Sequence, residues 1–281
     1  MSYTGGHMPV MLEQFWLISL GLVVGAFGTL IGAGGGFVLM PVLILLYPSD
    51  TPEFLTSISL VVVFVNALSG SIAYGRMKRI DYKSGLSFSA AAIPGAILGA
   101  LTTTMLPRRL FDAVFGVLLI SVAPFLLLRS GARREVENGS TKGQFVRNLM
   151  DAGGTQYIYS YNAWLGMGVS VVVGYLSSLL GIGGGIIHVP VMAFLLNFPI
   201  HVATATSHFV LALTSATGTV VHVAMGSFTH GLRAVIFLSI GVAIGAQLGA
   251  RLAKRIHGSW IIRGLALGLG FVGIRILIMS F

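Results

Sequence analysis

Two short stretches of the chain combine clustered glycines with a proline inside otherwise apolar sequence. Gly32–Pro41 has the sequence GAGGGFVLMP, and Gly181–Pro190 has the sequence GIGGGIIHVP. Each glycine lowers the stability of a helix interior by about 1 kcal/mol and proline removes a backbone donor, so both stretches are predicted to interrupt a helix. A helix that begins again behind such a break presents free N–H groups and a partial positive charge, which favour an anion. The predicted anion cradle consists of Gly34, Gly35, Gly36, Gly183, Gly184 and Gly185.

Uncharged polar side chains near these clusters, or at matched positions in the other half, are predicted to complete the site. Hydroxyl, amide and imidazole groups can hydrogen-bond an oxyanion without the cost of burying a cation. The predicted binding side chains are those of Ser59, Asn66, His188, Thr206, Ser207, His208 and Gln247. His188 or His208 could also take up and release a proton. The alternative is that each imidazole only donates to the backbone of a neighbouring helix.

The acidic residues exclude several classes of function. All eight lie in loops or near the ends of apolar runs: Glu13, Asp50, Glu53, Asp81, Asp112, Glu135, Glu137 and Asp151. Carriers of cations usually place a carboxylate at membrane depth, so this distribution favours an anionic ligand. The sequence also offers no nucleophile with a base, no cluster of metal ligands, and no Lys-Ser/Thr pair behind the glycines. We therefore predict a protein that is not an enzyme and that uses no cofactor or metal ion.

The composition indicates that these elements lie in a membrane. Of the 281 residues, 55% are hydrophobic and 9% are charged, and the mean hydropathy is +0.91. Soluble domains carry about 25% charged residues. The net charge of +9 comes from short loops, which indicates membrane topology and no binding of nucleic acid. Eight apolar runs approach or exceed the ~20 residues of a membrane-spanning helix. They are Phe15–Pro48, Phe54–Tyr74, Gly85–Leu106, Leu110–Leu128, Trp164–Phe198, Val202–Met225, Leu232–Ala250 and Trp260–Met279.

The second half of the chain repeats the first, which defines the fold. The two glycine clusters match at a constant offset of 149 residues, and matches such as Ser59 with Ser207 continue at 148. We predict an all-α polytopic membrane protein with two homologous repeats of four apolar runs, residues 12–128 and 162–281. The first run of each repeat is broken at its glycine cluster. A polar cytoplasmic linker, residues 129–161, joins the repeats and is expected to contain a short amphipathic helix around Gln144–Met150.

The duplication also bears on what the glycines do. One cluster alone would favour close packing of membrane helices through small residues, but two clusters with matched prolines favour the anion cradle. The halves are nevertheless not chemically equal. Leu39 and Leu60 stand in the first half where the second half has His188 and His208. The second half is therefore predicted to carry more of the specificity.

The basic residues predict that the two repeats have opposite orientations in the membrane. If each broken run enters and leaves as a two-piece hairpin, each repeat has an odd number of crossings and the second is inverted. Thirteen basic residues then lie on the cytoplasmic side and three on the other, against ten and six if each broken run crosses once. The positive-inside rule favours the inverted arrangement, with both breaks near the bilayer midplane.

A duplicated G-x-G-G-G followed by a Pro-Val pair, in a basic and cysteine-free chain of eight apolar runs, resembles the sulfite exporter TauE/SafE family. This family is also called the 4-toluene sulfonate uptake permease family. The resemblance covers nearly the whole chain and is most specific at Gly32–Pro41 and Gly181–Pro190. It implies a multi-pass protein, typically of the bacterial inner membrane, that carries sulfite, an organosulfonate or a sulfonated carboxylate.

From the residues and the resemblance together, we expect a secondary transporter that moves a small sulfur-containing anion across the lipid bilayer by alternating access. An anion channel, or a carrier of a non-sulfur organic acid, is the alternative. Coupling to a proton, to sodium or to no ion stays open at this point, as does the oligomeric state.

Overall fold

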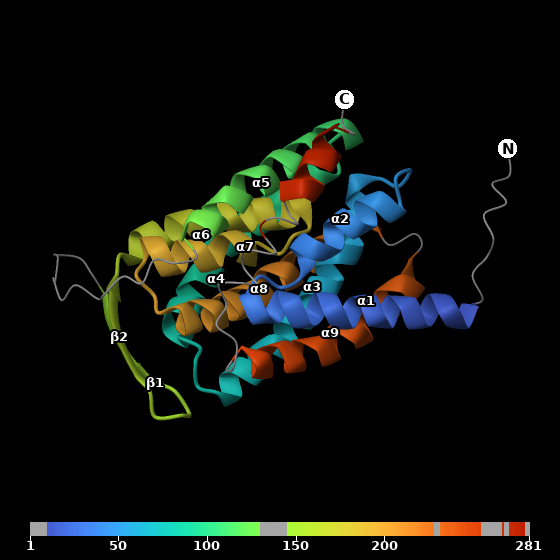
Figure 1. Ribbon diagram of the computed structural model, residues 1–281. Coiled ribbons are helices and arrows are strands. Elements are labelled where there is room, and N and C mark those ends of the chain that lie inside the picture. Colours follow the sequence, from blue (N-terminus) through green and yellow to red (C-terminus); the bar gives the residue numbers. More distant parts are fainter. Residues whose placement is uncertain (1–9, 130–144, 228–230, 254–265, 267–269, 279–281) are drawn as a thin grey trace, which may run out of the picture.

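The computed structural model describes residues 10–129, 145–227, 231–253, 266 and 270–278. This part of the chain is helical except for one β-hairpin (Figure 1). The helical elements are α1 (Val10–Ile31), α2 (Gly36–Leu46), α3 (Pro52–Arg76), α4 (Tyr82–Thr103), α5 (Arg108–Arg129), α6 (Ala163–Leu180), α7 (Gly185–Pro190), the π-helical η1 (Val191–Leu195), α8 (Ile200–Ala224) and α9 (Leu232–Leu252). Six of them, α1, α3, α4, α6, α8 and α9, are long and apolar enough to cross a membrane. The chain is a multi-pass membrane protein.

Six of the eight apolar runs predicted from the sequence contain one of these membrane-length helices. The run Leu110–Leu128 forms α5, which is not among the six. In Figure 1, α5 lies next to the C-terminal helical segment drawn in red. The two are packed closely, since a methyl group added at Gly116 would lie 2.9 Å from the carbonyl oxygen of Gly273. The run Trp260–Met279 falls largely outside the described residues.

The predicted helix breaks are confirmed. The first long run divides into α1 and α2, and the second divides into α6 and the continuous pair α7 and η1. At the breaks, Gly32, Gly34 and Gly35 have φ between +77° and +84°, and the matched glycines of the second half have φ between +65° and +80°. Side chains rarely allow this left-handed conformation, so glycine is required for the chain to leave one helix and start the next.

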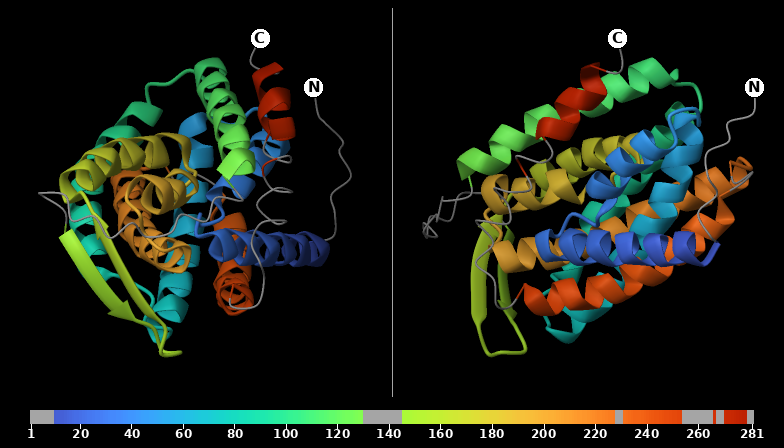
Figure 2. Two further views of the ribbon diagram at one scale, coloured as in Figure 1. Left: turned by 60° about the vertical axis from the view of Figure 1, so that its left-hand side comes forward. Right: turned by 45° about the vertical axis from the view of Figure 1, so that its right-hand side comes forward.

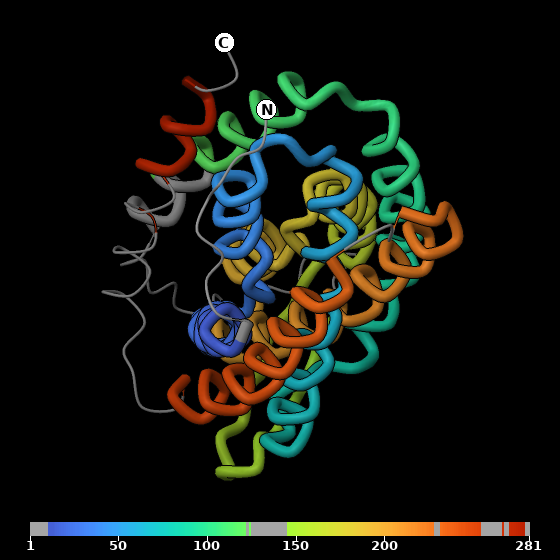
Figure 3. Tube along the Cα trace, turned by 90° about the vertical axis from the view of Figure 1, so that its right-hand side faces the viewer, coloured from blue at the N-terminus to red at the C-terminus, as the bar shows by residue number. Residues whose placement is uncertain are grey.

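Helices of the first half of the chain pack against helices of the second half. α1 lies along α9, and α4 lies along α6. Figure 3 looks along α1, which is seen end-on beside the orange-red α9. A methyl group added at Gly245 would overlap the carbonyl oxygen of Leu22, and one added at Gly95 would overlap that of Val171. Gly95 matches Gly245 in the repeat, so the same glycine-mediated backbone contact is made twice. α3 and α8 pack against each other between these pairs.

The linker contains a β-hairpin, and the predicted amphipathic helix around Gln144–Met150 is wrong. β1 (Phe145–Met150) pairs antiparallel with β2 (Gln156–Tyr161), with Phe145 opposite Tyr161. β2 has the sequence QYIYSY, whose aromatic and β-branched residues favour a strand, and that partner decides the conformation of β1. Asp151 stabilises the turn, because its Oδ1 accepts hydrogen bonds from the N–H groups of Gly153 and Thr155.

α8 begins directly behind Pro199, and His201 lies in its first turn. Pro199 immediately before the helix fixes the entry of the chain, and its carbonyl accepts hydrogen bonds from the N–H groups of Val202 and Ala203. The helix therefore begins one residue earlier than the histidine.

Candidate functional site

The two helix breaks are in direct contact, as the repeat predicts. A methyl group added at Gly36 would lie 2.6 Å from the carbonyl oxygen of Ile182, and one added at Gly185 would lie 2.6 Å from that of Gly32. Each break therefore presses a glycine against the backbone of the other break. Any larger residue at either position would push the two breaks apart.

The breaks lie between the two central helices. Gly34 and Gly183 both face Val63 of α3 and Leu211 of α8, which occupy matched positions in the two halves. The side chain of Leu211 contacts both glycines, and so does that of Val63. The apolar pair closes the space between the breaks from the side of α3 and α8.

Hydroxyl groups of the central helices hold the breaks crosswise. Ser59 of α3 donates to the carbonyl oxygen of Gly181, with 2.5 Å between oxygens. Ser207 of α8 makes the matched contact to the carbonyl oxygen of Gly32 at 3.4 Å. Both serines are fully buried. A serine of the first half thus donates to a carbonyl group at the end of α6, and a serine of the second half donates to one at the end of α1. Carbonyl groups at a helix end have no partner within the helix itself.

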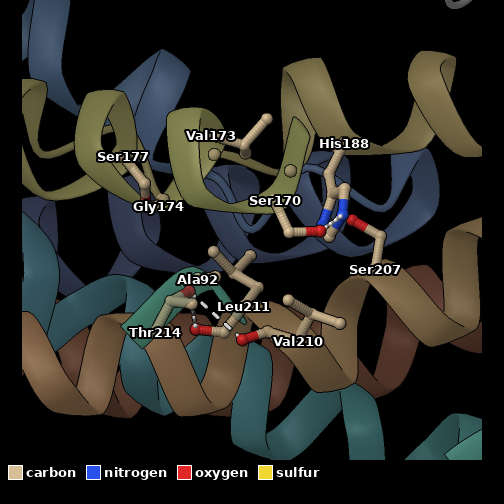
Figure 4. A pocket seen from close by; sticks show the side chains of 13 residues that line it. Ala92, Ser170, Val173, Gly174, Ser177, His188, Ser207, Val210, Leu211 and Thr214 are labelled. Atoms are coloured by element: carbon tan, nitrogen blue, oxygen red, sulfur yellow. Dashed lines mark hydrogen bonds between the residues drawn. The ribbon is translucent and has the colours of Figure 1, made fainter. Parts of the chain in front are cut away.

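A small cavity lies beside the second break (Figure 4). A water-sized sphere can occupy only about 10 Å³ of it, roughly the space that one water molecule needs, so the cavity has no room for a larger ligand in this conformation. Its glycine and polar lining residues are Gly174, Gly183, Gly184, Gly185, Ser170, Ser177, His188, Ser207 and Thr214. None of the described lining residues is charged, and all except Ala92 belong to the second half.

Ser170, His188 and Ser207 converge on one another in the cavity (Figure 4). The Oγ atom of Ser170 donates to the carbonyl oxygen of Gly166 at 2.7 Å and lies 3.1 Å from Nε2 of His188. A hydroxyl has one proton, so the imidazole must donate to Ser170 in this arrangement. The serine can turn its proton towards a ligand instead, with Nε2–H of His188 holding its oxygen.

Each break has one unpaired, fully buried polar group beside its middle glycine. The Oγ atom of Ser177 has no hydrogen-bond partner among the described residues, and a methyl group added at Gly184 would lie 3.2 Å from it. Nδ2 of Asn66 likewise has no partner in the described part of the chain, and a methyl group added at Gly35 would lie 3.4 Å from it. Buried donors are nearly always paired, so both groups indicate places where a ligand can accept a hydrogen bond.

On the first-half side, Asn66 belongs to a polar network. Oγ1 of Thr29 donates to Oδ1 of Asn66 at 3.0 Å, so the contact of 3.2 Å between Thr29 and Nε2 of His208 requires the imidazole to donate. The hydroxyl of Tyr74 donates to the carbonyl oxygen of Thr29 at 2.8 Å. This network joins α1, α3 and α8 at the end of α1. None of its residues lines the cavity, so His188 and His208 lie in different surroundings.

Two predicted binding residues lie elsewhere. Oγ1 of Thr206 accepts a hydrogen bond from the N–H group of Asp81 at 3.0 Å. Nε2 of Gln247 donates to the carbonyl oxygen of Ser69 at 2.7 Å and to its hydroxyl at 2.9 Å. Neither residue lines the cavity. In this structure Thr206 joins α8 to the start of α4, and Gln247 joins α9 to α3.

Three of the polar side chains that line the cavity were not predicted from the sequence, those of Ser170, Ser177 and Thr214. A signal for two of them was available. Ser170, Gly174 and Ser177 are spaced so that they share one helical face, directly before the second glycine cluster. On a helical face of small and hydroxyl residues that leads into a helix break, a ligand can approach both the hydroxyl groups and the backbone of the break. Thr214 gave no such signal, although it matches Asn66 in the repeat.

Six membrane-length helices in the described part of the chain, together with two broken helices that meet beside an uncharged polar cavity, are typical of membrane transport proteins. Residues 17–276 match the family described as Sulfite exporter TauE/SafE, and the chain belongs to this family. It is a multi-pass membrane transporter.

Several curated relatives carry similar descriptions. The chain is 40% identical over 216 residues to the probable membrane transporter protein YunE of Bacillus subtilis, a match covering 75% of this chain and 78% of the relative. It is 27% identical to the probable membrane transporter protein MJ0441 of Methanocaldococcus jannaschii, over 72% of this chain and 69% of the relative. It is 26% identical to the probable membrane transporter protein YjnA of Bacillus subtilis, over 85% and 91%. No solved structure matches the chain significantly.

Proposed function

We propose that the protein is a secondary transporter for a small sulfur-containing anion, such as sulfite, an organosulfonate or a sulfonated carboxylate, and that the anion binds beside Gly183–Gly185. The observation that carries this proposal is the unpaired hydroxyl of Ser177 next to Gly184, in a cavity whose described lining is polar but uncharged. An oxyanion would accept that hydrogen bond and so pair the hydroxyl.

The chemistry of the lining supports an anion over a cation. The N-terminus of the segment that starts at Gly185 supplies the partial positive charge of a helix dipole. Ser177 supplies an unpaired hydroxyl, and Ser170 can supply a second donor when Nε2–H of His188 holds its oxygen. A cation of the same size would need carboxylates or converging carbonyl groups, and no acidic residue is among the described lining. Sulfite and sulfonates carry three oxygens on one sulfur, which suits donors arriving from several helices.

Alternating access is proposed from the pairing of the two halves. The contacts between Gly95 and Val171 and between Gly245 and Leu22 are equivalent in the repeat, so two related arrangements of the same elements are available to the chain. We propose that the repeats are inverted relative to the membrane, as the distribution of basic residues favours. The cavity would then open to one side and the other in turn.

Transport is tested with purified protein in proteoliposomes, using radiolabelled sulfite and sulfoacetate, with acetate for comparison. Uptake is measured under a proton gradient, a sodium gradient and neither, which also identifies the coupling ion. The proposal expects saturable uptake of a sulfur oxyanion that exceeds uptake of acetate. Flux that does not saturate would indicate a channel, and uptake of acetate alone would indicate a carrier of non-sulfur acids.

Gly184→Leu and Gly154→Leu form a matched pair for the location of the site. Both glycines have positive φ, so both substitutions strain the backbone similarly. Only Gly184 lines the cavity, whereas a methyl group at Gly154 would meet nothing within 4 Å. Uptake should be lost in Gly184→Leu and kept in Gly154→Leu. If folded Gly184→Leu protein transports normally, the anion binds elsewhere.

A further inference from the structure

An aromatic layer connects the β-hairpin to the cavity. The ring centroids of Tyr159 and Tyr161 of β2 lie 4.6 Å and 4.9 Å from that of Phe198. The ring of Tyr161 lies 5.8 Å from that of Phe88 of α4, and Phe88 lies 5.9 Å from the imidazole of His188. Figure 2 shows the hairpin in yellow-green at the end of the bundle where β2 leads into α6. These aromatic residues lead inward from it to a residue that lines the cavity.

Phe88 lies between the cavity and that end of the bundle. On α4 it comes four residues, about one helical turn, before Ala92, which lines the cavity. On α6, Gly166 likewise comes one turn before Ser170, and a methyl group added at Gly166 would lie 2.6 Å from Cζ of Phe88. The side chain of Phe88 is fully buried. An anion leaving the cavity along α4 and α6 towards the hairpin would meet this ring first.

Ion pairs hold the hairpin against the loop between α3 and α4. Nη2 of Arg147 on β1 lies 2.7 Å from Oδ1 of Asp81, and its Nε lies 3.0 Å from Oδ2. The hydroxyl of Tyr159 donates to the same carboxylate at 2.9 Å. The hydroxyls of Ser84 and Tyr161 are 2.6 Å apart. The two tyrosines of the aromatic layer are thus fixed by the same cluster that binds Arg147.

The tip of the hairpin is attached separately. Nη2 of Arg79 lies 3.2 Å from Oδ2 of Asp151, and the N–H group of Ala152 donates to the carbonyl oxygen of Met77 at 2.9 Å. The hairpin is therefore fastened near both of its ends, and the aromatic layer lies under it. The rings of Tyr161 and Phe198 pack against Phe88 on the side away from the cavity, with centroids 5.8 Å and 6.2 Å from its own.

We propose that Phe88 is the gate of the cavity towards the hairpin end, and that the hairpin is the clamp that keeps this gate closed. Opening towards that side requires the hairpin to release Tyr161, which the contact between Arg147 and Asp81 opposes. The inference rests on the proposed function in one respect, that the cavity is the transport site. It assigns the closing of one access route to a residue outside the cavity lining.

The absence of cysteine from the chain allows a direct test of access. Ser170→Cys places a single thiol in the cavity, and its reaction with a membrane-impermeant maleimide is timed in vesicles of each orientation. Ala152→Cys, exposed at the hairpin tip, identifies the orientation in which the hairpin side faces the reagent. The thiol at position 170 should react slowly in both orientations. Adding Arg147→Ala or Phe88→Ala should accelerate its reaction at least tenfold, from the hairpin side only.

Arg76→Ala is the matched control, since it removes an exposed arginine from the same end of the bundle without touching the cluster around Asp81. It should leave labelling unchanged. Phe88→Ala opens the gate with the clamp intact, so the test survives if Arg147→Ala fails to fold. Unchanged labelling in both folded variants, or acceleration from the opposite side, would overturn the proposal. Labelling of the thiol does not require transport. Accelerated labelling in a protein that takes up no anion would refute only the proposed function. Anion uptake by a protein whose labelling is not accelerated by either substitution would refute only this inference.

Discussion

The hydroxyl of Ser59 donates to the carbonyl oxygen of Gly181 at 2.5 Å, across 122 residues of sequence. This bond joins the middle of the first half to the helix break of the second. Its repeat-matched counterpart, between Ser207 and Gly32, is 3.4 Å long and correspondingly weak. The two breaks are therefore held unequally, and the tighter bond supports the break beside the cavity.

We expect Ser59→Ala to destabilise the protein by about 1–3 kcal/mol, because it leaves a buried carbonyl group without its partner. Ser207→Ala should cost less, since the contact that it removes is already long. The comparison is made by thermal unfolding of the purified variants in detergent. Equal losses of stability in the two variants would contradict the assignment of the stronger bond to Ser59.

Ser177→Ala should separate stability from function. The hydroxyl has no partner among the described residues, so its removal should leave the melting temperature unchanged or slightly raised. Uptake of the anion should fall about tenfold, the equivalent of one hydrogen bond of about 1.4 kcal/mol. Ser215→Ala is the control, because Ser215 is buried on α8, donates to the carbonyl oxygen of Leu211 and does not line the cavity. If both variants transport equally, Ser177 does not contact the anion.

Gly245→Ala should destabilise the protein, by about 1–3 kcal/mol, because the added methyl group would overlap the carbonyl oxygen of Leu22. Gly168→Ala tests the same substitution where a methyl group would meet nothing within 4 Å. There the higher helix propensity of alanine should stabilise the protein by up to about 1 kcal/mol. Thermal unfolding of the two variants gives both values, and a stabilised Gly245→Ala would show that α1 and α9 are not in backbone contact.

Stability at acid pH should depend on Asp81. Burial alone would raise the pKa of this carboxyl group, but hydrogen bonds from Arg147, Ser84 and Tyr159 outweigh burial and lower it below its usual value. A carboxylate with a lowered pKa in the folded state contributes its full stability above about pH 4, the pKa of the unfolded chain, and loses it as the pH falls further. The melting temperature of the wild type should therefore decline steeply below pH 4.

Asp81→Asn removes this titration, so its melting temperature should be lower than that of the wild type at pH 7 and should change less between pH 5 and pH 3. The variant Glu13→Gln replaces an acid on α1 that makes none of these contacts, and its pH profile should follow the wild type. A profile for Asp81→Asn that is parallel to the wild type would show that another group controls acid stability.

Much of the fold follows from local properties of the sequence. Apolar runs of about 20 residues can satisfy their backbone in a bilayer only as helices, so α1, α3, α4, α6, α8 and α9 were predictable. The breaks at Gly32–Gly36 and Gly181–Gly185 were predictable too, because glycine alone tolerates the left-handed backbone found there. The repeat offset further implied that the two breaks belong together.

The linker was not predictable in the same way. A six-residue segment such as Phe145–Met150 has no helix or strand preference strong enough to decide its conformation, and only pairing with Gln156–Tyr161 makes it a strand. Its attachment through Arg147 to Asp81 depends on a contact between distant parts of the chain, for which no sequence period exists.

The sequence by itself determined the membrane helices, the two breaks and the set of uncharged polar residues from which a site can be built, because each depends on the local chain and its solvent. Only the tertiary structure decided which of those residues meet. His188 and Ser207 line one cavity with Ser170 and Ser177, whereas His208 bonds to Thr29 and Gln247 bonds to Ser69. The physical reason is that the neighbouring helix determines which groups a side chain in a bundle meets, and the neighbouring helices here come from opposite halves of the chain.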